Sequence, residues 1–145
     1  MKALIQRVAH ASVTVEGQVV GRIHRGLLVF LGIDAEDDNA VADRLLSKVL
    51  NYRVFPDENE HMNLSVQDIK GQLLIVSQFT LSASTNKGLR PSFSAAKAPA
   101  LAEPLYAYFA EQATKHIAVE TGEFGADMKV ELLNDGPVTF LLSMD

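Results

Sequence analysis

The sequence predicts an α+β protein in which a mainly antiparallel, curved and barrel-like β-sheet carries two flanking helices. Strand-like runs of apolar and β-branched residues dominate the chain, turn signals join several of these runs, and only two stretches have a helical period. We expect residues 1–145 to form a single domain, because this length suits one core and 48% of the residues are hydrophobic.

The first part of the chain predicts a series of strands. Residues 2–9 alternate well enough for a strand, and residues 12–23 carry β-branched runs on both sides of Glu16-Gly17-Gln18, which predicts a hairpin. Residues 26–33 form a continuous apolar run, which is typical of a buried strand. This run is far shorter than the roughly 20 residues of a membrane-spanning helix, so we expect a cytoplasmic protein without membrane contact.

A first helix is predicted over residues 37–52. Val41, Leu45 and Val49 fall at i, i+4 and i+8, which places them on one apolar stripe. Acidic residues at 37 and 38 suit the N-terminus of this helix, where the macrodipole favours negative charge. After a polar turn at 56–61, the apolar run at 72–81 predicts a buried strand that becomes polar at Ser77.

A second helix is predicted over residues 101–116, with Pro104 in its first turn. One face of this helix carries Leu101, Leu105, Tyr108 and Phe109. The segment before it, residues 82–98, lacks a clear period, and a loop of this length inside a compact domain is often functional. Two closing strands are predicted at 127–133 and 138–142.

The junction between these closing strands conflicts with an ordinary hairpin. Asp135-Gly136 is a strong turn signal, but Pro137 removes a backbone donor at the start of the returning strand. An X–Pro bond can also be cis. The sequence therefore predicts a rigid corner, and it leaves open whether that corner only turns the chain or also contacts another molecule.

Composition excludes several kinds of chemistry. The chain has no cysteine, which excludes disulfides, thiolate metal sites and cysteine nucleophiles. Its four histidines are scattered and no phosphate-binding loop occurs, so we predict neither a metal nor a cofactor. The net charge of −5 argues against broad binding to nucleic-acid backbone, but not against capture of one RNA end in a shaped pocket.

The stretch Ser77-Gln78-Phe79-Thr80 is a candidate site of chemistry. If the strand continues through it, Ser77 and Phe79 face one way and Gln78 and Thr80 the other. Polar side chains beside free backbone N–H groups can bind a carbonyl oxygen or an oxyanion, although polar groups that only satisfy a turn are the more common outcome. A Ser-His-Asp site is not indicated, because no GxSxG elbow and no neighbouring histidine are present.

Two other stretches can be interpreted in two ways each. Residues 87–93 place two cations on a long loop, which suits contact with a phosphate, but a solvated loop is more common. Phe124 and Met128 form an apolar pair that can pack in a core or stack against a base.

Taken together, five stretches resemble the D-aminoacyl-tRNA deacylase family of the bacterial type. They are, in this order, MKALIQRVAHASVTVEG, VSQFTL, GLRPSF, TGEFGADM and NDGPVTF, and they span residues 1 to about 141. The resemblance implies a homodimeric cytoplasmic enzyme with a β-barrel-like sheet, which needs no metal. Such an enzyme hydrolyses the ester that joins a D-amino acid, or glycine mischarged on tRNA-Ala, to the terminal adenosine of tRNA. The alternatives are a non-catalytic module for the tRNA 3′ end, a general hydrolase of small esters, and a purely structural dimer.

The resemblance also implies roles for the candidate residues. Ser77, Gln78, Phe79 and Thr80 correspond to the family's catalytic motif, in which backbone N–H groups, including that of Phe79, polarise the ester carbonyl. Thr80 is a candidate nucleophile, but nothing obvious in the sequence activates its hydroxyl. Attack by water, assisted by the 2′-OH of the terminal adenosine, is the simpler scheme.

The remaining correspondences concern substrate binding. Phe124 and Met128 match residues that help to enclose the adenine. Gly136-Pro137 matches a Gly-cisPro motif that enters the active site of the partner subunit, where its rigid backbone excludes an L side chain by clash and admits glycine. Arg7 matches a residue that holds this motif in place. The resemblance therefore implies active sites at the subunit interface.

Overall fold

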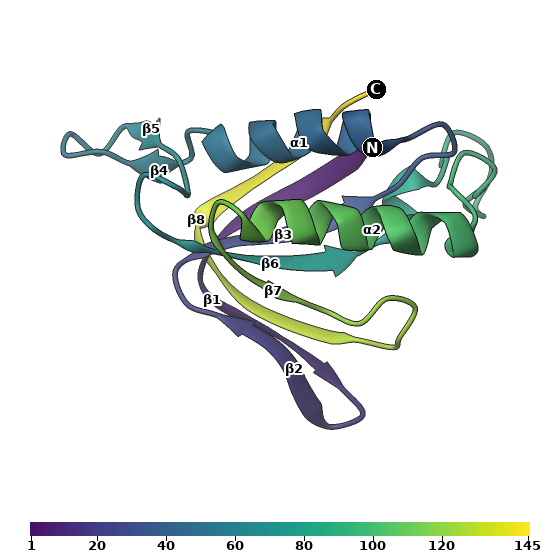
Figure 1. Ribbon diagram of the computed structural model, residues 1–145, viewed down its shortest axis with the longest axis horizontal. Coiled ribbons are helices and arrows are strands. Elements are labelled where there is room, and N and C mark those ends of the chain that lie inside the picture. The colour runs from purple at the N-terminus through teal and green to yellow at the C-terminus, as the bar shows by residue number, and fades with distance from the viewer.

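The computed structural model describes all of residues 1–145 (Figure 1). Its strands are β1 (Lys2–Val15), β2 (Gln18–Ile23), β3 (Gly26–Gly32), β4 (Phe55–Pro56), β5 (Met62–Leu64), β6 (Gln72–Ser77), β7 (Ala118–Thr121) and β8 (Lys129–Ser143). Its helices are α1 (Asn39–Asn51), α2 (Pro99–Thr114) and the short 3-10 helix η1 (Phe79–Ser82). No helix combines the length and the apolar character needed to cross a membrane.

The main sheet runs in the order β2-β1-β3-β6-β7, and β8 pairs with β1. β1 is antiparallel to β2, β3 and β8, whereas the β3–β6 and β6–β7 pairs are parallel. The predicted α+β class with a curved sheet is confirmed, and the parallel pairs make the sheet mixed. Parallel neighbours need a crossover connection, and α1 and α2 lie in these two connections.

The sheet curls until it is nearly closed into a barrel. The first half of β1 pairs with β3 and the second half with β2, while β8 follows β1 along its length. The two outer strands β2 and β7 then come close together at Gly21 of β2 and Thr121 of β7. A Cβ atom added at Gly21 would lie only 2.5 Å from the carbonyl oxygen of Thr121. Only glycine permits this approach of two backbones.

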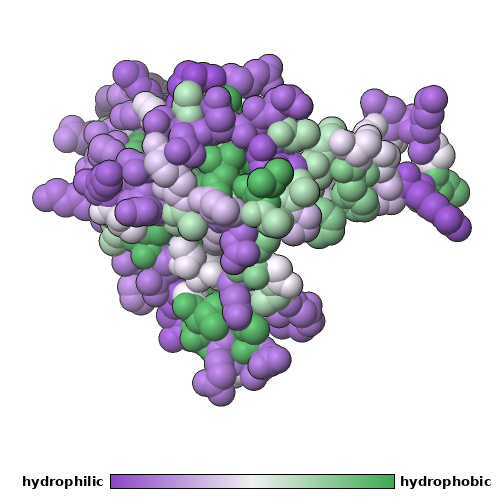
Figure 2. Space-filling view, turned by 45° about the vertical axis from the view of Figure 1, so that its right-hand side comes forward, coloured by the Kyte–Doolittle hydropathy of each residue, from purple (hydrophilic) through white to green (hydrophobic).

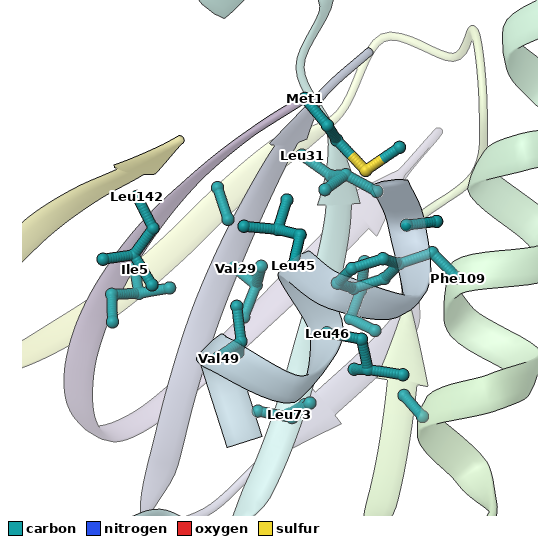
Figure 3. Close-up of a cluster of buried hydrophobic side chains, with 14 of the residues drawn as sticks. Met1, Ile5, Val29, Leu31, Leu45, Leu46, Val49, Leu73, Phe109 and Leu142 are labelled. Carbon is teal, nitrogen blue, oxygen red and sulfur yellow. The ribbon is translucent and has the colours of Figure 1, made fainter. Parts of the chain in front are cut away.

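Two apolar clusters fill the two sides of the sheet. The larger cluster lies between the sheet and the helices, and Figure 3 shows Leu45 and Val49 of α1 close to Val29 of β3 within it. The smaller cluster lies on the other face, inside the curve, and consists of Val8, Ala11, Val13, Ile23, Leu28, Leu74 and Val76. The predicted apolar stripe of the first helix is confirmed, since Val41, Leu45 and Val49 are all buried.

The start of the chain is tied to the segment before α1. The α-ammonium group of Met1 donates to Asp34 at 3.0 Å and to Asp37 at 2.9 Å. Asp38 caps α1 by accepting a hydrogen bond from the backbone N–H of Val41 at 3.0 Å. Of the two acidic residues predicted to suit the start of the helix, Asp38 therefore does so, whereas Asp37 is a partner of the N-terminus.

The second helix differs from its prediction in its start and in part of its buried face. It begins at Pro99, so Pro104 lies inside the helix and not in its first turn. Of the predicted face, Leu105 and Phe109 are buried and Tyr108 is partly buried, whereas Leu101 is 66% exposed. The buried face is set by the contact with the sheet and consists of Ala102, Leu105, Tyr106, Phe109 and Ala113.

The end of the chain also differs from its prediction. The two closing strands predicted at 127–133 and 138–142 are parts of one strand, β8, which runs through the whole region, and the short strand β7 was not predicted. β1 is long enough to pair with both halves of β8, and this long-range pairing overrides the local turn signal. Gln6 pairs with Thr139 and Val8 with Asn134, so residues 135–138 bulge out opposite Arg7 alone. The Gly136–Pro137 peptide bond within this bulge is cis.

Hydrophilic side chains cover much of the face seen in Figure 2, and a green apolar patch remains at its lower end, where Figure 1 places the β1–β2 hairpin. Val19 and Val20 of β2 are about half exposed. Most of the exposed large apolar side chains lie on strands: Val19, Val20, Met62, Leu133, Phe140 and Leu141. The helices contribute little to the apolar surface.

Candidate active site

A cavity of about 630 Å³ lies at the carboxyl ends of the parallel strands β3 and β6. Thirteen of its eighteen lining residues are hydrophobic, which is typical of a site for a small organic group. Its walls come from four segments, which contribute Phe30, Leu31 and Ile33; Val76 to Phe79; Phe93 and Ala96 to Pro99 with Ala102; and Phe124 to Ala126 with Met128 and Val130. Three of the predicted catalytic residues and both predicted adenine-binding residues therefore line one space.

The first wall is the point where β6 ends. The backbone N–H of Gln78 donates to the carbonyl of Leu31 at 2.8 Å, which extends the β3–β6 ladder by one residue. The chain then turns into η1, so the predicted alternation of side chains through residue 81 is wrong beyond Gln78. The backbone N–H of Phe79 is the first of this helical turn and has no acceptor within the chain, which leaves it free for a ligand.

Thr80 does not line the cavity. Its side chain is exposed, and its hydroxyl oxygen accepts a hydrogen bond from the amide of Gln78 at 2.5 Å. No group of the protein accepts a hydrogen bond from this hydroxyl, so no base is in place to remove its proton. In this arrangement the Thr80 hydroxyl is the hydrogen-bond partner of the Gln78 amide.

Phe124 and Met128 form the opposite wall, in the turn between β7 and β8. The ring of Phe124 packs against that of Tyr106 with 5.8 Å between centroids. The Tyr106 hydroxyl donates to the carbonyl of Ile75 at 2.7 Å, and the N–H of Gly122 donates to the same carbonyl at 3.0 Å. Burial raises the pKa of Tyr106 to about 12, so this hydroxyl stays protonated as a donor. The start of the turn is therefore fixed to the end of β6.

The mouth of the cavity has an aromatic pair, Phe79 and Phe93, of which the sequence predicted only Phe79 as a site residue. The rings of Phe79 and Phe93 lie 5.1 Å apart between centroids and are 62% and 40% exposed. Phe93 comes from the long loop before α2, and no local pattern indicates that this loop returns to the end of β6. The exposure of two neighbouring rings suits contact with another flat group.

The corner at Gly136-Pro137 lies elsewhere on the chain and is exposed. Arg7 donates to the carbonyl of Asp135 at 2.7 Å and to the carbonyl of Val54 at 2.6 Å. The Asn134 side chain accepts a hydrogen bond from the N–H of Val138 at 2.8 Å, across the base of the bulge. These bonds brace the corner on both sides.

Neither the corner nor Arg7 contributes to the lining of the cavity. The strand that bears the corner, β8, pairs only with β1 and so has a free edge. Exposed apolar side chains flank the corner on this strand, with Leu133 at 53%, Phe140 at 36% and Leu141 at 55%. No group of three or more His, Cys, Asp or Glu side chains is placed to hold a metal ion.

The fold and the cavity define a small α+β protein with a ligand pocket at the ends of two parallel strands. The chain belongs to the family described as D-Tyr-tRNA(Tyr) deacylase, whose model matches residues 4–143. D-aminoacyl-tRNA deacylases from Actinobacillus pleuropneumoniae serotype 5b and Haemophilus influenzae (strain 86-028NP) are 62% and 58% identical to it, over 99% of this chain and all of theirs.

Two solved structures resemble the whole chain. One, named "c-Myc DNA Unwinding Element Binding Protein", has a TM-score of 0.94 at 44% identity and covers 99% of this chain and 98% of its own. The other, described as "Structural Analysis of a probable eukaryotic D-amino acid tRNA deacylase", has a TM-score of 0.84 at 16% identity and covers 97% of both chains. The second likeness concerns the fold alone.

Proposed function

We propose that this protein hydrolyses the ester bond of D-aminoacyl-tRNA, and of glycyl-tRNA mischarged on tRNA-Ala, and leaves L-aminoacyl-tRNA intact. The observation that carries the proposal is the identity of 58–62% to full-length curated D-aminoacyl-tRNA deacylases. The cavity supports it, since Ser77, Gln78 and Phe79 lie in one space with Phe124 and Met128. Such an activity keeps mischarged tRNA out of translation, and its place is the cytoplasm. We take residues 1–145 as the single domain that performs it.

The proposed chemistry uses positioning and charge stabilisation. The terminal adenosine lies against Phe124 and Met128, and the ester carbonyl faces the backbone N–H of Phe79. This N–H stabilises the oxyanion that forms when water attacks, and the vicinal 2′-OH of the adenosine assists the attack. Thr80 positions the Gln78 amide, with which it shares a hydrogen bond of 2.5 Å.

Thr80→Ala separates this scheme from covalent catalysis by the hydroxyl. Because the variant retains the oxyanion donor and the 2′-OH, we expect it to keep more than about a tenth of the wild-type kcat/KM for D-Tyr-tRNA. Replacement of the terminal 2′-OH by hydrogen, in a substrate with the amino acid on the 3′ oxygen, is expected to abolish turnover by the wild type. Near-total loss of hydrolytic activity in Thr80→Ala, together with normal turnover of the deoxy substrate by the wild type, would establish Thr80 as the nucleophile.

The proposed selectivity comes from a second subunit. The corner at Gly136-Pro137 is exposed and braced, and it lies on a free strand edge between exposed apolar residues. We assign this edge to a homodimer, in which the corner of one subunit reaches the cavity of the other. Its rigid backbone then occupies the space of an L side chain, so L substrates are rejected by clash and glycine is accepted.

Three alternative functions predict different results. A module that only binds the tRNA 3′ end predicts no turnover, and a general esterase predicts cleavage of simple D- and L-esters without an adenosine. A purely structural dimer predicts neither binding nor turnover. DNA binding, which the name of one similar structure states for that protein, has little electrostatic support here, because the net charge is −5.

The deciding assay uses purified protein with D-Tyr-tRNA and with the ethyl esters of D- and L-tyrosine. We expect release of D-tyrosine from the tRNA and no hydrolysis of the ethyl esters above the rate in buffer. An intact D-Tyr-tRNA, under conditions in which a D-aminoacyl-tRNA deacylase from a relative cleaves it, would refute the proposal.

A further inference from the structure

The tip of the long loop between η1 and α2 has no role in the site described above. No carboxylate occurs in the sequence between Asp68 and Glu103, although acidic residues exceed basic ones in the whole chain, which has a net charge of −5. Within this segment the loop tip carries Lys87 and Arg90. The loop is therefore positive in an otherwise acidic protein, which favours an anionic partner.

The loop tip, residues 85–91, is closed at its base by a neck that consists of Ser84 and Ser92. Ser84 and Ser92 exchange two backbone hydrogen bonds, of 2.8 Å and 2.9 Å, so residues 85–91 form a separate excursion. Gly88 turns the chain at the tip with φ of +64°, and every residue of the excursion is exposed. Lys87 and Arg90 make no hydrogen bond and no ion pair within the chain, so both charged groups are free for a ligand.

The neck lies at the mouth of the cavity. Phe93 follows it directly and packs against Phe79, with 5.1 Å between ring centroids, and both rings line the cavity. Lys87 and Arg90 lie at most three residues from the neck, which keeps their backbones within about 10 Å of it. In Figure 1 the loop lies beyond the arrowhead of β6, on the side where the cavity-lining end of this strand lies.

We infer that Lys87 and Arg90 bind the phosphates of the RNA strand that immediately precede the terminal adenosine. This inference rests on the proposed function, in which the cavity takes the adenosine and the amino acid. The rest of the strand must then leave through the mouth and pass the loop. The guanidinium of Arg90 suits a phosphate geometrically, and the ammonium of Lys87 contributes a point charge. These contacts position the strand and read no base.

The double variant Lys87→Gln, Arg90→Gln tests this surface with two substrates. For D-Tyr-tRNA at low salt we expect kcat/KM to fall about tenfold, and the slope of log kcat/KM against log salt to become shallower by about 1.4, since each lost phosphate contact removes about 0.7. The 3′-O-D-tyrosyl ester of adenosine has no phosphate, so its hydrolysis is expected to stay unchanged. Lys48→Gln, an exposed cation on α1, is the matched control and should leave the values for both substrates as in the wild type.

Two results would overturn the inference. One is an unchanged salt slope for D-Tyr-tRNA, and the other is an equal loss with the adenosine ester, which would assign the loop to the shape of the cavity. Binding of uncharged tRNA gives a readout that does not depend on hydrolysis. If the wild type hydrolyses neither substrate, the proposed function is refuted. The role of the loop is then decided by tRNA binding alone. It is supported if the double variant binds tRNA more weakly and with the same change in salt slope, and refuted if the variant binds tRNA as the wild type does.

Discussion

At the scale of single residues, the corner at Gly136 has no space for a side chain. A Cβ atom at Gly136 would lie 2.7 Å from the backbone nitrogen of Val138 and 3.3 Å from the Arg7 guanidinium. The backbone of Val138 cannot yield easily, because its N–H is bonded to Asn134. Glycine at this position therefore allows the bulge to adopt its shape, and Arg7 and Asn134 hold it there.

Gly136→Ala is expected to displace the corner and to relax selectivity. Because the clash involves backbone, the bulge must shift, and we expect the ratio of D-Tyr-tRNA to L-Tyr-tRNA hydrolysis to fall at least about tenfold, the effect of some 1.4 kcal/mol. Asp135→Ala is the matched control, since Arg7 binds the carbonyl of this residue and not its side chain. A Gly136→Ala enzyme with wild-type selectivity would show that the corner does not discriminate.

At the scale of secondary structure, much of the fold follows from period and turn chemistry. The apolar stripe of α1 and the β1–β2 hairpin were predictable because both depend on residues close in sequence. β7 and the continuity of β8 were not, because long-range pairing decides them and the four residues of β7 are only partly buried or exposed. The candidate site shows the same limit. The polar end of β6 was visible in the sequence, but the return of Phe93 to the mouth of the cavity was not.

Tyr106 is the residue of α2 that links the two walls of the cavity. Tyr106→Phe removes its buried hydrogen bond to Ile75, but this carbonyl retains its bond from Gly122. We therefore expect the free energy of unfolding, measured by urea denaturation, to fall by about 1 kcal/mol. Tyr108→Phe loses a more exposed bond to Asp43 and should cost less than about 0.5 kcal/mol. An equal decrease in the free energy of unfolding of the two variants would contradict the assignment of Tyr106 as the residue that links the two cavity walls.

At the scale of the whole molecule, one cluster of charges connects the start of the chain with the segment before α1. Burial alone would raise the pKa of Asp34, but the nearby Ser82 hydroxyl, the Lys2 ammonium and the α-ammonium of Met1 together hold it below its usual value of 3.8. A carboxyl with a lowered pKa in the folded state contributes stability that is present above pH 3.8 and is lost as the pH falls through the folded-state pKa.

Asp34→Asn should therefore change how the free energy of unfolding depends on pH in the acidic range. We expect the wild type to lose free energy of unfolding as the pH falls below about 4, and the variant, which is less stable at neutral pH, to lose less over the same range. Asp127→Asn is the control, because this carboxylate is 87% exposed and pairs only with Lys129. Parallel acid profiles for the wild type and Asp34→Asn would contradict the assignment.

The proposal that the corner of one subunit serves the cavity of the other can be tested with mixed dimers. Phe124→Asp places a charge in the cavity wall and is expected to inactivate a subunit that still has a normal corner. When it is co-refolded in large excess with Gly136→Ala, nearly every active cavity receives a normal corner from an inactive partner. The ratio of D to L hydrolysis should then rise toward the wild-type value as inactive protein is added. A ratio that stays at the Gly136→Ala value would place the corner in the same subunit as the cavity it serves.

The central claim is the discrimination of chirality on tRNA. Its most direct test is a paired measurement of single-turnover rates for D-Tyr-tRNA and L-Tyr-tRNA, charged on the same tRNA and mixed with an excess of the wild-type protein. We expect the D ester to be cleaved and the L ester to decay at the rate seen in buffer. Appreciable cleavage of the L ester, or equal stability of both, would contradict the account.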